Sequence, residues 1–185
     1  MRASSTRGVT VLSAATYMLV FRILHILAAI AWGGTVFLLV FFLQPTAKAI
    51  GPAAGPFMRE LLGVRRLTDW VLRIAGVAIV AGGFLYWHDL FGRSLGDFLG
   101  TAFGLWLTIG AVSALIAFAI GLFATAPTLN RMLAVGGQIA QAGDASPPEL
   151  VAELGALQAR GRALAKMNLT FVTIAAFAMS TARYW

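Results

Sequence analysis

The sequence predicts an all-α polytopic membrane protein, a bundle of four transmembrane helices with short interfacial helices, formed as one membrane domain of 185 residues. Two observations support this fold class. Hydrophobic residues make up 59% of the chain and charged residues only 11%, whereas an average soluble domain carries about 25% charged residues. The apolar residues also gather in blocks of about 20, the length at which an α-helix crosses a bilayer. Soluble enzyme folds are therefore excluded.

The first predicted span, residues 17–43, is interrupted only by Arg22 and His25. Arg2 and Arg7 precede it, as in the basic start of a signal peptide. The apolar block is nevertheless too long for the core of a signal peptide and ends without a convincing cleavage site. We therefore expect an uncleaved first helix.

Three further spans are predicted at residues 70–91, 105–124 and 167–184. In the connection before the last span, Ser146 is followed by two prolines and a glutamate, which is a typical start of a helix with Ser146 as its N-cap. A helix beginning there can run into the fourth span. In the first connection, an amphipathic stretch from Phe57 predicts a short interfacial helix.

The two halves of the chain share a short pattern. Gln44-Pro45-Thr46 and Ala126-Pro127-Thr128 each follow a span that contains phenylalanine, which hints at a two-plus-two internal repeat. The second half has no counterparts of His25 and Trp32, and proline ends helices in many unrelated chains. The two segments therefore give only weak support for an internal repeat.

Basic residues are distributed unequally over the two sides of the predicted bundle. One side, with both termini and the second connection, carries Arg2, Arg7, Arg22, Arg93 and Arg183. The other side carries Lys48, Arg59, Arg65, Arg66, Arg73, Arg131, Arg160, Arg162 and Lys166. The richer side is expected in the cytoplasm, so both termini should face out. The net charge of +7 then reflects topology and anionic lipid, and nucleic acid is not an expected partner.

The residue inventory limits the chemistry. The chain has no cysteine, which excludes disulfides, thiolate nucleophiles and iron–sulfur clusters. No carboxylate lies deep within a span, and no serine, histidine and acid arrangement or nucleotide-binding motif is present. No catalytic residue is assigned, and we do not expect an enzyme that works with its own side chains alone.

Two histidines are the strongest candidates for a site, because His25 and His88 are both predicted in the outer leaflet. An ionisable residue within a span is costly, and neutral imidazole is a ligand of haem iron, copper and zinc. Met18, Arg22 and Trp32 share the face of His25 on the first helix. On that face the indole could wall a flat macrocycle, and the guanidinium could bind its propionates.

Copper is the alternative to haem. Met18 and Met179 fall near the outer ends of the first and last spans, and thioether with imidazole suits Cu(I). A structural role is open for each residue. His25 could donate a hydrogen bond to a neighbouring helix, His88 could belong to an interfacial aromatic belt with Trp87, and the methionines could fill gaps.

Residues 24–34 resemble the first helix of membrane proteins related to the copper-resistance protein D family, with Leu-His, six residues and then Trp-Gly-Gly. Residues 168–184 are similar to the last helix of small four-helix relatives of that family. Together the two stretches cover about a sixth of the chain. The resemblance implies a bacterial inner-membrane protein linked to copper handling, with His25 as the candidate ligand.

A second resemblance is to the four-helix membrane protoporphyrinogen oxidase, a haem enzyme with a similar Leu-His and Trp start. Residues 35–44 lack the Tyr-Leu-Pro-Arg and His pattern of that enzyme, which argues against it. Three functions stay open: handling copper or carrying haem b at His25, serving as a noncatalytic subunit of a larger membrane complex or homo-oligomer, and acting as a haem-dependent oxidase.

Single cysteines placed near Arg93 and near Gly143 test the orientation, since the chain has none of its own. A membrane-impermeant maleimide added to intact cells should label the cysteine near Arg93, and should label the one near Gly143 only after permeabilisation, because nine of the fourteen basic residues lie on the second side. The reverse labelling pattern would place both termini in the cytoplasm.

Overall fold

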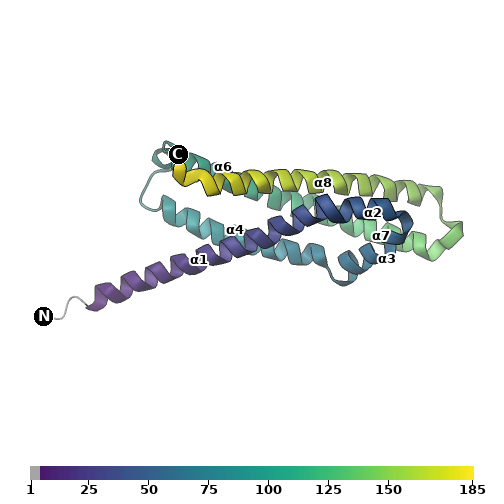
Figure 1. Cartoon of the computed structure of the whole chain (residues 1–185), viewed down its shortest axis with the longest axis horizontal. Helices are drawn as coiled ribbons and strands as arrows, with labels where there is room; N and C mark the ends of the chain where they lie inside the picture. Colours follow the sequence, from purple (N-terminus) through teal and green to yellow (C-terminus); the bar gives the residue numbers. More distant parts are fainter. Residues whose placement is uncertain (1–4) are drawn as a thin grey trace.

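Four helical rods run side by side in the computed structural model of the chain (Figure 1). The structure describes the backbone of residues 5–185 and the side chains of residues 15–185 except Pro52 and Asp144. Within that part there are helices and no strand, and four helices are long and apolar enough to cross a membrane. The predicted all-α four-helix bundle is confirmed. Arg2 and the side chain of Arg7 lie outside the described residues.

Each rod is longer than the span predicted from hydropathy. The main helices are α1 (Ser5–Leu38), α2 (Gln44–Ile50), α4 (Leu67–Leu90), α6 (Ala102–Ala119), α7 (Ala126–Ala142) and α8 (Pro148–Thr181). Short helices α3 (Ala54–Arg59) and α5 (Leu95–Leu99) lie in the connections. One π-helical turn, Leu39–Leu43, joins α1 to α2, and another, Ile120–Thr125, joins α6 to α7, so each pair forms one continuous rod.

The π-helical turns lie directly before prolines. Pro45 and Pro127 lack an N–H, and in a regular α-helix the proline ring would clash with the carbonyl four residues earlier. A wider turn with one extra residue relieves that clash without ending the helix. Sequence reasoning treated these prolines as ordinary helix ends, whereas the structure continues both helices past them.

The hint of an internal repeat gains structural support from the ends of α2 and α7. Both helices stop at a glycine with positive φ, 60° at Gly51 and 57° at Gly143, and a short 3-10 turn follows each. The order of span, π-helical turn, proline and glycine is therefore the same in both halves. The second version is longer, because α7 has 17 residues and α2 has 7, a difference of ten.

The connection before α8 contains one correction. Helix α8 begins at Pro148 and runs without interruption into the fourth span, as the sequence predicted. Ser146 is not its N-cap, however, because Pro147 holds that position. The Ser146 hydroxyl lies 2.6 Å from the carbonyl oxygen of Gly143 and 3.1 Å from that of Ile139, so it donates to the end of α7 instead.

Charged residues mark where the bilayer crosses the bundle. A Cβ on Gly33 of α1 would lie 3.2 Å from Val172 of α8, and these helices are antiparallel. Arg22 lies eleven residues before Gly33 and Arg183 eleven after Val172, so both lie at one level. Lys166 lies 17 residues before Arg183, about 26 Å along α8. This spacing is close to the roughly 30 Å of a hydrocarbon core.

The bundle consequently has two ends, which we name by position. The terminal end contains the start of α1 and the end of α8, and the basic end contains α2, α3, α7 and the first half of α8 (Figure 1). The basic end continues beyond the charged level at Lys166. It therefore projects from the bilayer as helices and not as loops.

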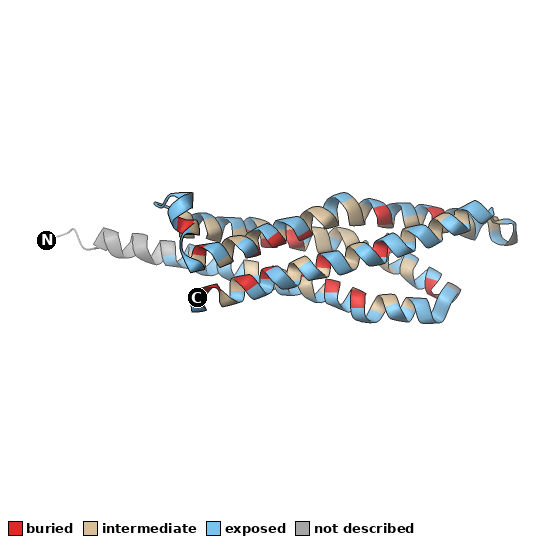
Figure 2. Cartoon of the chain, turned by 90° about the horizontal axis from the view of Figure 1, so that it is seen from above, coloured by how far each residue is buried: buried red, intermediate tan, exposed pale blue. Residues whose placement is uncertain are grey.

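Small residues let the helices approach inside the bilayer. Trp32 and Val36 of α1, with Val40 of the π-helical turn that follows, pack with Ala75 and Ala78 of α4 and with Ala117 of α6. Figure 2 shows the buried residues as short red segments on faces that turn toward neighbouring helices, with exposed residues between them. Large apolar side chains on the outer faces are available to lipid, as hydropathy predicted.

Gly110 offers a test of this packing. A Cβ there would lie 2.6 Å from Cγ of Met179 and 3.2 Å from the carbonyl oxygen of Ala175. Gly110→Leu should lower the free energy of unfolding by about 1–3 kcal/mol, because α6 and α8 would have to separate. Thermal unfolding in detergent measures this, with Gly34→Leu as the control since nothing lies within 4 Å of a Cβ at Gly34. Equal melting temperatures for the two variants would contradict the packing.

Candidate functional site

His25 joins α1 to α4. Its Nδ1 lies 2.8 Å from the carbonyl oxygen of Ala78, and because a carbonyl only accepts, Nδ1 must carry the proton and donate. Gly82 makes room for the ring, since a Cβ there would lie 2.7 Å from Cε1 of His25. The structural alternative raised from sequence, a hydrogen bond to a neighbouring helix, is thus observed. Nε2 has no hydrogen-bond partner among the described residues.

The structure does not bring His88 to His25. His88 follows Gly82 by six residues, which is about 9 Å along α4 and more than one and a half turns around it. Its side chain is 56% exposed, and Nδ1 lies 3.8 Å from a carboxylate oxygen of Asp89. No group of three or more His, Cys, Asp or Glu side chains gathers anywhere in the described part of the chain.

The other predicted ligands are also dispersed. Met18 is half-buried and lies seven residues, about 10 Å, before His25 on α1. Arg22 is exposed. Met179 packs against Gly110, between α6 and α8. Trp32 is only 6% exposed and lies two turns beyond His25, toward the basic end.

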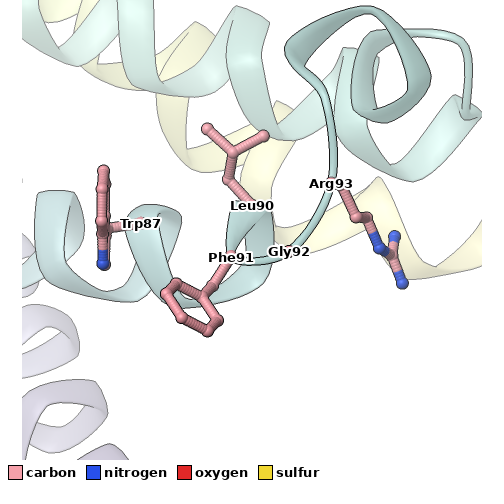
Figure 3. A pocket seen from close by; sticks show the side chains of 5 residues that line it. All are labelled: Trp87, Leu90, Phe91, Gly92 and Arg93. Carbon is pink, nitrogen blue, oxygen red and sulfur yellow. The ribbon is translucent and has the colours of Figure 1, made fainter.

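A recess of about 300 Å³ lies at the terminal end, lined by Trp87, Leu90, Phe91, Gly92 and Arg93. Figure 3 shows the Trp87 and Phe91 rings projecting from the end of α4 and the Arg93 side chain directed away from them. Trp87 is 63% exposed and Phe91 76%. Exposed aromatic rings at this level are typical of an interfacial belt, so the recess does not extend the histidine site.

A much larger cavity, of about 860 Å³, lies toward the basic end. Its walls come from α1, α2, α3, α4, α6, α7 and α8, and most of its lining is apolar. It reaches from Trp32 to Lys48 on the first rod, sixteen residues or about 24 Å along the helix. Its volume is in the upper part of the range of about 300–1,000 Å³ that small-molecule sites occupy.

Glycines form much of the cavity wall. Nothing lies within 4 Å of a Cβ built at Gly55, Gly136, Gly137, Gly155 or Gly161, and all five line the cavity. Gly161 is itself a buried residue. A buried glycine normally has a neighbour packed against it, so open space at this position means that α8 faces the half-open cavity here.

Two polar oxygens of residues that line the cavity have no hydrogen-bond partner in the described structure: Asn168 Oδ1 and Thr125 Oγ1. Asn168 is only 6% exposed, and its Nδ2 donates to the carbonyl oxygen of Ala117 at 2.7 Å, which leaves the amide oxygen free to accept. A buried acceptor without a partner is costly, so a bound water or ligand group is expected there.

Three cations line the cavity on separate elements: Lys48 on α2, Arg59 on α3 and Arg162 on α8. None of them has an ion-pair or hydrogen-bond partner for its side chain in the described part of the protein. Three acids at this end pair with other cations, in the contacts Glu60–Arg65, Asp69–Arg66 and Glu153–Arg131. The cavity therefore presents positive charge without a neutralising partner.

Sequence reasoning missed this cavity. It read the basic residues of this end as topology signals. The available signal was the pair Gly136-Gly137 inside an amphipathic helix, together with Gly155 and Gly161 before the fourth span. Glycine inside a helix is unfavourable, so several of them in neighbouring helices indicate a packing or functional reason.

Comparisons with protein-family models, with curated proteins and with solved structures find no match to this chain.

Proposed function

We propose that the protein binds a membrane amphiphile in the cavity at its basic end. The observation that carries this proposal is the cavity of about 860 Å³, apolar along most of its wall and about 24 Å long. An acyl or isoprenyl chain is long, narrow and apolar, and such a chain would fill this shape. Water would fill it poorly, because few polar groups line it.

The position of the cavity fits a ligand that comes from the bilayer. Trp32 and Asn168 lie on the membrane side of the charged level at Lys166, whereas Lys48 lies beyond that level. A lipid that entered sideways could keep its chain at membrane depth and its head group at the projecting end. We further propose a bacterial inner membrane with both termini outside, so that the ligand comes from the cytoplasmic leaflet.

Fluorescence of Trp32 can test whether a chain enters. The chain has five tryptophans, and replacing Trp70, Trp87, Trp106 and Trp185 by Phe leaves the one that lines the cavity. In nanodiscs whose phospholipids carry bromine in mid-chain, Trp32 should be quenched, because it is buried from bulk lipid and only a chain in the cavity reaches it.

Filling the cavity supplies the matched comparison. Gly161→Leu, or Gly155→Leu if that protein does not fold, should reduce the quenching of Trp32 by at least half, since each places four carbons in the void. Gly83→Leu on α4 is the control, because a Cβ there also meets nothing within 4 Å but does not line the cavity. No quenching in the unfilled protein, or equal quenching in all variants, would contradict chain entry.

A second candidate function, copper handling or haem b binding at His25, is supported by one specific observation. The Nδ1–H of His25 donates to the Ala78 carbonyl, which leaves the lone pair of Nε2 available. Metal-bound histidines commonly hold their second ring nitrogen in this way. The same hydrogen bond serves equally well to join two helices, and for that reason this candidate stands second.

Absorption spectroscopy and elemental analysis test the second candidate. Protein purified after supplementation with copper and haem should show a Soret band or bound copper, and His25→Ala should lose it. His88→Ala shows whether the second histidine shares the centre, since loss in both variants would mean common ligation. If the unmodified protein binds neither, the candidate fails and the accessory-subunit interpretation is favoured.

A further inference from the structure

We infer that the cavity selects an amphiphile with an anionic phosphate head group, held by Lys48, Arg59 and Arg162. This inference rests on the proposed function, and it adds the chemistry of the ligand. The three side chains approach the cavity from α2, α3 and α8, and none is paired within the described structure. Unpaired cations on several elements around one void are what an anion requires.

The cavity lining also disfavours a positively charged group on the ligand. None of the described residues that line it is an aspartate or a glutamate. The ammonium of a zwitterionic head group would therefore meet three cations and no carboxylate. Like charges repel, so a phosphate without an attached cation is favoured over phosphocholine.

The two ends of the cavity differ in polarity, and this difference orients the ligand. Asn168 Oδ1 lies toward the membrane, where an anion would face an acceptor oxygen. Arg162 precedes Asn168 by six residues on α8, about 9 Å toward the basic end. The phosphate consequently belongs at the basic end, and a hydroxyl, an amide N–H or a water can donate to Asn168 Oδ1.

Arginine and lysine together match phosphate better than they match a carboxylate. A guanidinium binds two phosphate oxygens side by side, and a lysine ammonium adds a point charge. Three cations exceed the single charge of a fatty acid, whereas the phosphate monoester of phosphatidic acid carries a charge of about −1.5 to −2 at pH 7. Phosphatidylglycerol is a diester with a single negative charge, and it is favoured over a fatty acid only through its paired phosphate oxygens. The occupant is therefore assigned as an anionic phospholipid of the adjacent leaflet.

The Trp32-only protein measures this selectivity in nanodiscs. A small fraction of brominated lipid is added to unbrominated phosphatidylcholine, with phosphatidic acid, phosphatidylglycerol, phosphatidylcholine or a fatty acid as the brominated species. Phosphatidic acid and phosphatidylglycerol should quench Trp32 at about tenfold lower mole fraction than phosphatidylcholine, the equivalent of losing one charge-assisted contact. Higher salt should narrow that difference, because exposed ends of the site are screened.

Neighbouring residues on α8 provide a matched pair. Arg162→Gln should raise the required mole fraction of phosphatidic acid about tenfold. Arg160→Gln removes the same charge two residues away and should change little, because both side chains are exposed but only Arg162 lines the cavity. Lys48→Gln and Lys166→Gln form a second pair of the same design.

The outcomes separate this inference from the proposed function. If no brominated lipid quenches Trp32, chain entry itself fails. If all four lipids quench equally, or if Arg160→Gln acts as strongly as Arg162→Gln, the chain enters but the phosphate site is wrong. Preferential quenching by the fatty acid would replace phosphate by carboxylate as the recognised group.

Discussion

The bundle depends on where a helix lacks side-chain bulk. In the membrane, glycine and alanine at helix contacts allow close approach: Gly110 receives Met179, Gly82 receives the His25 ring, and Ala117 presents its carbonyl to Asn168. At the basic end the same residue type has the opposite result, since Gly155 and Gly161 face no neighbour and leave a void. The same residue type thus permits close packing at Gly82 and Gly110 and leaves open space beside the buried Gly161.

The two prolines control how far the rods reach. If Pro45 and Pro127 had ended their helices, loops would begin near the membrane surface. No helices would then line the part of the cavity that lies beyond that surface. The π-helical turns instead accommodate each proline, so that α2 and α7 carry the rods past the charged level at Lys166. Because this order of turns, proline and glycine occurs in both halves, the projecting walls of the cavity are built twice from one local pattern.

Hydropathy predicted the fold because the four apolar blocks and the start of α8 are properties of consecutive residues. The site was less predictable because it depends on the direction in which each residue points around its helix, and on glycines that have no side chain. His25 and His88 share a leaflet by counting residues, yet His88 follows the contact residue Gly82 by six positions and points elsewhere on α4. Glycines give no hydrophobic signal, so a void that they line has no counterpart in the hydropathy pattern.

The basic residues of this end serve two physical roles that a charge count cannot separate. Any lysine or arginine beside a span contributes to orientation through the bilayer, and nine of them do so here. Arg160 and Arg162 contribute alike to that bias, although only Arg162 lines the cavity. The rotation of α8 over two residues places Arg162 at the cavity and Arg160 away from it, although both side chains are exposed. A topology signal and a binding residue are therefore distinguished by helix phase.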